Sequence, residues 1–192
     1  MGAFMRRIGA LLVLAFSVLA PLASVAWAVD GAAHCLKGTH FTVAFRERAN
    51  AVGSLIIAHP LEGVGASACT LKRGKASFAI GGADDALYVQ GLIGDILVLD
   101  VGTGPDRQLT LYDLSKRREI LSLAYDSDAP LALSADAIEL HEIVDGASPE
   151  NCPDYKKFEA DGLTAALARP IRLHLPELTR EGIGAQTCVA RQ

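Results

Sequence analysis

The sequence contains none of the short motifs that usually identify a metal or nucleotide site. Its four cysteines form no C-x-x-C pair, and its five histidines form neither H-x-H nor H-E-x-x-H, the close spacings on which zinc sites typically depend. The segment Gly102–Asp106 is rich in glycine, but it lacks the Gly-Lys of a phosphate-binding loop and precedes a strand-like run rather than a helix. We therefore assign no catalytic, cofactor-binding or metal-ligating residue.

The chain also lacks an excess of basic residues and, after its N-terminal segment, any long apolar run. Its formal net charge is −4, which argues against nucleic acid and against anionic membrane surfaces as partners. A membrane-spanning helix needs roughly 18 or more consecutive apolar residues. We expect no stable membrane insertion of the chain beyond the N-terminal segment.

The N-terminal segment has the three parts of a secretory signal peptide. Arg6 and Arg7 supply a positive start, and Ile8–Ala20 is an apolar core too short to span a membrane. Ala26-Trp27-Ala28 provides the small residues of a cleavage site. The sequence predicts a signal peptide over residues 1–28, cleaved after Ala28, and a periplasmic or secreted protein.

Cleavage leaves residues 29–192, which are 164 of the 192 residues. The removed part contains two arginines and no acid, so the net charge changes from −4 to −6. A chain of this length can bury one hydrophobic core, and no long linker divides it. We expect a single all-β domain over residues 29–192.

The cysteines predict two disulfides, because an exported chain with an even number of cysteines usually pairs them. Three pairings of Cys35, Cys69, Cys152 and Cys188 exist, and we favour the sequential one, Cys35 with Cys69 and Cys152 with Cys188. On the chain-entropy model each closed loop of about 35 residues would stabilise the fold by roughly 3–4 kcal/mol.

Short runs of alternating or continuous apolar residues recur along the chain and predict strands. The clearest are Thr39–Phe45, Ile96–Leu99, Gln108–Asp113, Glu119–Tyr125 and Ala137–Ile143. The run Ile96–Leu99 is apolar at every position, so we expect a central strand that is covered on both faces. The pattern predicts an all-β fold, an antiparallel meander forming a sandwich, a barrel or a small propeller-like sheet array.

The C-terminal third combines one helix with further strands. We expect one short helix near 153–160, with Asn151 as its N-cap. Ile171–Leu175 alternates and is bounded by prolines, which predicts a strand. We expect 185–190 to pair beside it, after a turn over 179–184.

Part of the meander resembles one blade of a WD-like β-propeller. The resemblance lies in Leu109–Leu114 followed by Glu119–Leu121, within a segment of about fifty residues, and the chain is too short for a ring of blades of about 40–45 residues each. It implies a twisted antiparallel meander. The overall layout is similar to that of small periplasmic inhibitors and immunity proteins, which implies binding to an envelope hydrolase.

These observations favour a non-enzymatic binding protein, inhibitor- or immunity-like, that acts on another envelope or secreted protein. Function in such a scaffold is expected at the turns. The predicted contact residues are Gly102, Thr103, Gly104, Asp106, Arg107, Lys116, Arg117 and Arg118.

Two alternatives stay open. One is a hydrolase-like envelope enzyme whose site is assembled from distant residues, with His141, His174 and nearby acids as its bases. The other is a structural envelope protein. We expect His40, His141 and His174 to face solvent, on strands and opposite their apolar faces; convergence of two of these groups in a pocket would favour the enzyme.

Overall fold

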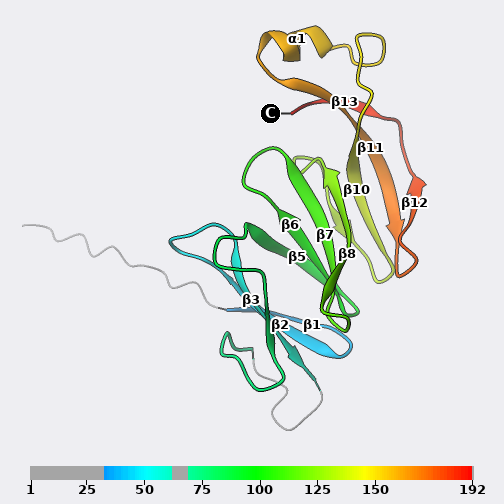
Figure 1. The fold of residues 1–192 in the computed structure, drawn as a ribbon. Helices are drawn as coiled ribbons and strands as arrows, with labels where there is room; N and C mark the ends of the chain where they lie inside the picture. Colours follow the sequence, from blue (N-terminus) through cyan, green and yellow to red (C-terminus); the bar gives the residue numbers. More distant parts are fainter. Residues whose placement is uncertain (1–32, 62–68, 192) are drawn as a thin grey trace, which may run out of the picture.

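The computed structural model describes residues 33–61 and 69–191 as antiparallel strands with one short helix (Figure 1), which confirms the all-β prediction. The predicted signal peptide lies outside the described residues. The elements are β1 (His34–Lys37), β2 (Phe41–Glu47), β3 (Ser54–Pro60), β4 (Phe78–Ile80), β5 (Leu87–Ile93), β6 (Ile96–Val101), β7 (Arg107–Asp113), β8 (Arg118–Tyr125), β9 (Ala132–Leu133), β10 (Ala137–Val144), α1 (Tyr155–Ala160), β11 (Thr164–His174), β12 (Thr179–Gly182) and β13 (Thr187–Arg191).

The strands form two open sheets that stack as layers. The first sheet has the order β1-β2-β3-β4, and the second has the order β12-β11-β10-β8-β7-β6-β5, with β13 beside β11 and β9 beside β10. The second sheet folds over itself, so β5–β8 lie between the first sheet and the strands β10–β13 (Figure 1). Within the described residues the sheets do not close into a barrel, and the architecture is sandwich-like.

Strand β6 lies at the centre of these layers because both of its faces are apolar. Leu97 and Leu99 pack with Val43 and Ile56 of the first sheet, in one buried cluster. Val98, on the other face, packs in a second cluster with residues of β7, β8, β10 and β11. The side chains of Leu97, Val98 and Leu99 are fully or almost fully buried. This confirms the prediction of a central strand covered on both sides.

The two halves of the second sheet meet at a single residue pair. Strands β8 and β10 pair only at Tyr125 and Glu142, whereas β7 pairs with β8 over almost their whole length. Because so few backbone hydrogen bonds hold this joint, the sheet can turn sharply there and bring Ile138 and Leu140 over Leu109 and the rest of the second cluster.

Strand β11 differs from the predicted strand. We expected Pro170 to precede it, but β11 runs through Pro170 from Thr164 to His174. Two partners lie end to end along its outer edge: β12 pairs with the C-terminal half and β13 with the N-terminal half. Pro170 lies between these two ladders, where its missing N–H breaks no strand pairing. The prediction that 179–184 is a turn and that 185–190 pairs beside Ile171–Leu175 is therefore wrong.

The predicted short helix is present but begins later than expected. Its N-cap position is Asp154, and Asn151 does not cap it. The Asn151 side chain instead accepts a hydrogen bond from the Ser148 N–H and donates one to the Gly146 carbonyl, which closes the preceding loop. The helix ends before Gly162, whose φ of 75° suits glycine.

Both disulfides form with the predicted sequential pairing, Cys35 with Cys69 and Cys152 with Cys188. They indicate an oxidising location outside the cytoplasm. In the described parts of the chain, the structure contains no helix with the length and apolar character needed to cross a membrane.

The first sheet is fixed to the middle layer where two turns meet. The His40 backbone N–H donates to the Asp95 carboxylate, and His40 Nδ1 lies 2.6 Å from Asp95 Oδ2. The Thr39 N–H donates to the Gly94 carbonyl at 3.2 Å. Gly38 lies so close to that carbonyl that an added Cβ would collide with it.

Candidate functional site

A cleft of about 280 Å³ opens where β10 leaves β11. The two strands pair as far as Val144 and Leu167, after which the chain diverges at Asp145. Thr164–Ala166 then keep only β13 as a partner, and a gap remains on their other side. The cleft is lined by Asp106, Ile143, Asp145, Gly146, Ala147, Thr164, Ala165, Ala166 and Arg191.

An ion pair closes one side of this cleft. Arg191 Nε of β13 lies 2.5 Å from Asp106 Oδ1 of the β6–β7 loop, and only 16% of the Arg191 side chain is exposed. Asp145, on another wall, is exposed and has no ion-pair partner among the described residues. With two carboxylates and one guanidinium, the cleft carries an excess negative charge, and it suits a cationic group.

A row of polar side chains lies behind the cleft; it is largely buried at its centre and partly exposed at Arg169. Arg107, Tyr125, Glu142 and Arg169 are paired directly across four adjacent strands, and residues paired in this way share a face. Arg107 and Glu142 adjoin the cleft residues Asp106 and Ile143 in the chain. The row therefore supports the strand ends that form the cleft.

One half of the row is organised by Asp100, which is 7% exposed. Arg107 donates to both of its carboxylate oxygens, and this contact raises the pKa of Arg107. Burial, followed by the charge of Asp100 and a hydrogen bond to it, raises the pKa of Tyr125 above its ordinary value. Tyr125 is therefore a hydrogen-bond donor and not an acid at neutral pH.

The other half is organised by Glu142, which is 5% exposed. Arg169 and Arg180 each contact one oxygen of its carboxylate, Arg169 at 2.6 Å. Two guanidinium groups offset the cost of burying one carboxylate. Arg169 Nε is buried with no hydrogen-bond partner in the described structure. Glu142, Arg169 and Arg180 are already paired with one another within the fold. We therefore assign them a structural role in holding the strands that form the cleft.

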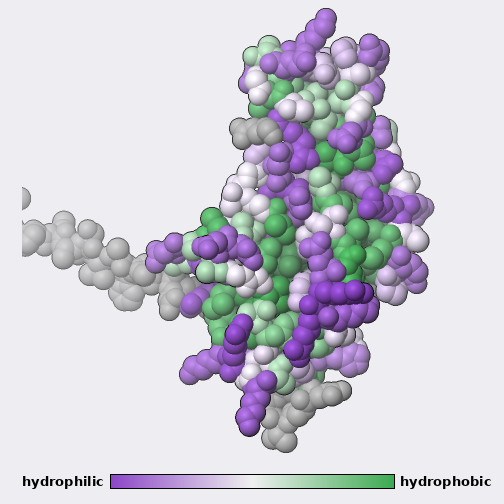
Figure 2. Space-filling view, viewed as in Figure 1, coloured by the Kyte–Doolittle hydropathy of each residue, from purple (hydrophilic) through white to green (hydrophobic). Residues whose placement is uncertain are grey.

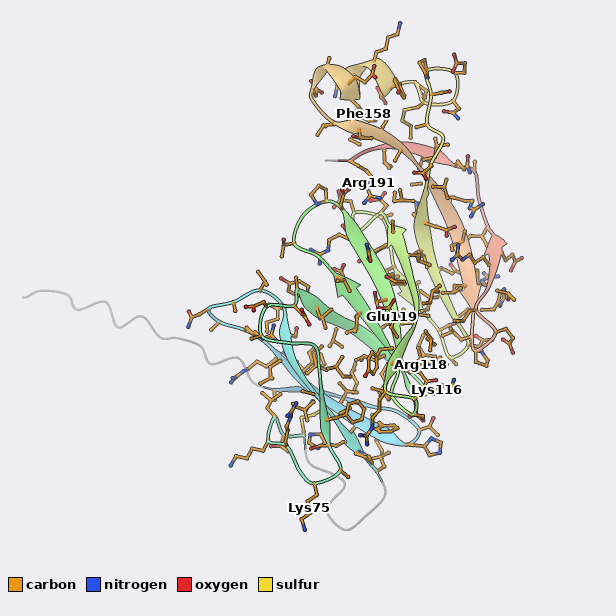
Figure 3. The ribbon with its side chains drawn as sticks, in the orientation of Figure 1. Lys75, Lys116, Arg118, Glu119, Phe158 and Arg191 are labelled. Atoms are coloured by element: carbon orange, nitrogen blue, oxygen red, sulfur yellow. A yellow bond between two sulfur atoms is a disulfide. The ribbon has the colours of Figure 1, made fainter. Side chains whose placement is uncertain are left out.

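The two predicted contact loops lie at opposite ends of strand β7. Gly102–Asp106 connects β6 to β7, and Lys116–Arg117 connects β7 to β8. Asp106 is one wall of the cleft, and the exposed side chains of the β7–β8 turn lie far from it, near Lys116 and Arg118 in Figure 3. The structure does not bring the two loops into one surface.

Three of the four basic residues among the predicted contact residues have structural contacts of their own. Arg107 points inward onto Asp100 and over the ring of Tyr88, 5.2 Å from its centroid. Lys116 pairs with Asp113 at 2.8 Å. Arg117 has a φ of 53°, and its guanidinium lies 4.5 Å from the centroid of the Phe78 ring. Arg107 is therefore a buried anchor, not a surface contact.

The three histidines that we expected on strands occupy separate places, and His40 lies in a turn instead of a strand. His40 pairs with Asp95 at the β1–β2 turn. His174 lies 3.1 Å from Glu181, and both are substantially exposed, at 40% and 56%. His141 is paired with Pro170, four residues along β11 from His174, or on the order of 13 Å away. No group of metal-binding side chains converges among the described residues.

Comparisons of the chain with protein-family models, with curated proteins and with solved structures found no match. The geometry alone therefore defines the candidate site.

Sequence reasoning found one wall of the cleft and missed the others. Asp106 was a predicted contact residue, because it follows a glycine-rich turn. Asp145 begins a stretch rich in Gly, Ser and Pro that carries no binding motif, and no sequence pattern singles out Arg191. The available indication of the cleft was the position of Asp145. It directly follows the last apolar residue of β10 and so marks the place where the chain leaves the sheet.

Proposed function

We propose that this protein is an exported, non-enzymatic binding protein, periplasmic or secreted, that engages another envelope protein in the manner of an inhibitor or immunity factor. The observation that carries the proposal is the cleft, in which the carboxylate of Asp145 has no ion-pair partner among the described residues and suits a cationic side chain of a partner. Its 280 Å³ volume is enough for one lysine or arginine side chain.

The surroundings of the cleft support a cationic partner. The segment 145–161 continues from its wall through α1 and carries five acidic residues and two lysines. All five acids are exposed, and Figure 2 shows hydrophilic residues over this end of the molecule. Charge complementarity of this kind mainly accelerates association and selects partners.

The scaffold supports binding more than catalysis. Its buried ionisable groups are engaged in ion pairs that hold strands together, and its strand histidines lie apart. A disulfide precedes α1 and ties it to β13, so the cleft is built on a fixed framework. The hydrolase-like alternative has no comparable geometric support.

The test uses charge reversal at a residue that makes no ion pair. Purified protein is used as bait in a periplasmic extract at low salt, and the retained protein is purified and titrated against wild type, Asp145→Lys and the matched control Asp84→Lys. We expect a basic protein whose affinity falls at least about tenfold with Asp145→Lys. The control should stay within about twofold of wild type.

Two results would overturn the proposal. Retention of no protein at low salt is the first. The second is a retained protein whose affinity falls equally with Asp145→Lys and Asp84→Lys, because net charge rather than the cleft would then explain binding.

A further inference from the structure

The end of the molecule away from α1 carries a concentration of positive charge in an otherwise acidic chain. Two segments supply it: residues 70–77, before β4, and residues 114–118, around the β7–β8 turn, and neither contains an acid. We call their cations the basic end: Lys72, Arg73, Lys75, Lys116, Arg117 and Arg118.

The fold brings these two segments to the same end. The guanidinium of Arg117 stacks on Phe78, which directly follows the first segment. The Gly74–Ser77 turn fixes that segment through hydrogen bonds of the Ser77 hydroxyl, with Lys75 at its tip. Figure 3 shows Lys75, Lys116 and Arg118 in the half of the molecule opposite Phe158 and Arg191.

Most of this charge is not neutralised by the protein. All six side chains belong to exposed residues, and within the described part of the chain only Lys116 has a carboxylate partner, Asp113. The whole chain has a net charge of −4, so the chain outside the basic end has a charge of −10.

The composition of this surface limits the kind of partner. Protein interfaces usually need aromatic or aliphatic anchors, yet the exposed large hydrophobic residues of the described chain, Val52, Leu133 and Ile183, all lie outside these two segments. A flat anionic membrane would also face the −10 charge of the remainder. The cations come from two separate segments, so they match an anion with many charges along a flexible chain.

We propose that the basic end binds a linear phosphate polymer outside the cytoplasm, through contacts between its cations and successive phosphates. Such binding depends on the release of counterions and weakens steeply with salt. The surface is separate from the cleft, so this binding does not require the proposed function.

The test measures binding of fluorescently labelled inorganic polyphosphate to the full chain by anisotropy, at about 50 and 200 mM salt. Lys75→Gln/Arg118→Gln removes two unpaired cations of the basic end. Lys156→Gln/Lys157→Gln removes two exposed cations at the opposite end and is the matched control. Circular dichroism verifies that both variants are folded.

We expect the first variant to lose at least about tenfold in affinity and the salt slope to shrink by about 1.4, since each contact contributes about 0.7. The control should bind like wild type. Absence of binding at low salt, an equal loss in both variants, or equal competition by monomeric phosphate would each overturn the proposal. Asp145→Lys should keep its polyphosphate binding, which separates this result from failure of the cleft.

Discussion

Two buried carboxylates, Asp100 and Glu142, determine how the interior behind the cleft is held. Each is paired with arginine, and each lies where the sheet changes direction or ends. A buried carboxylate with paired arginines contributes little net free energy but is costly to break, because the remaining charges lose their partner. These side chains therefore fix the arrangement of strands more than they add to overall stability.

Glu142→Gln should lower the free energy of unfolding by about 2 kcal/mol, because two arginines lose their counter-charge. The value is reduced from that of a fully buried pair, since both arginines are 41% exposed. Urea denaturation measures it. Glu139→Gln is the control: both side chains of its pair with Arg172 are substantially exposed, so its loss should have little effect on stability. Equal losses would contradict the supporting role of Glu142.

Whether a single side chain is buried or exposed could be predicted only where the hydrophobic periodicity of the sequence determines it. Leu97, Val98 and Leu99 were expected in the core, because an apolar residue at every position requires cover on both faces. Arg107 was expected at the surface, since a charged residue after a turn usually is. Its burial depends on Asp100 in the neighbouring strand, a contact across the hairpin that no local pattern encodes.

Close contact between turns determines how the first sheet sits on the middle layer. The β1–β2 turn meets the β5–β6 turn through Thr39, His40 and Asp95. Side chains of Leu92 and Asp95 and the Gly94 carbonyl surround the position where Gly38 would carry a Cβ. Glycine at this position lets the two backbones approach.

Gly38→Ala should therefore destabilise the protein by about 1–3 kcal/mol, because the added methyl group forces the two turns apart. Thermal unfolding measures the change. Gly104→Ala is the matched control, since nothing lies within 4 Å of the Cβ it would add, and it should leave the melting temperature unchanged. A neutral Gly38→Ala would mean that the turns separate easily.

Element type was predictable, but pairing along the C-terminal strands was not. The alternation at Ile171–Leu175 correctly indicated a strand, and the flanking prolines suggested its limits. Strand β11 continued through Pro170 because its outer edge is divided between two partners. That division depends on where the chain after Leu175 returns, which is a property of tertiary packing and not of the local sequence.

Two disulfides, one toward each end of the molecule, each link a strand to a segment that lies outside the sheets. The Cys35–Cys69 disulfide fixes β1 to the segment of the basic end, and Cys152–Cys188 fixes the chain before α1 to β13. Helix α1 buries none of its residues, so apolar packing contributes little to its position. The Cys152–Cys188 disulfide therefore holds the acidic segment 145–161 beside the cleft.

Replacing Cys152 and Cys188 by serine should allow α1 and β13 to open locally, at a free energy well below that of global unfolding. We expect hydrogen exchange to accelerate in α1 and β13, while β6 keeps its protection, because its two clusters do not involve this disulfide. Hydrogen exchange read by mass spectrometry measures both regions. Equal acceleration in β6 would show that the disulfide stabilises the whole molecule.

The division of the long edge of β11 between β12 and β13 also affects self-association. An uncovered strand of eleven residues would offer a template for pairing with a second chain, a route to aggregation. Here the outermost strands are only four and five residues long, and β12 presents the charged pair Arg180 and Glu181. At this edge of the second sheet, a second copy of the chain would find little backbone to extend.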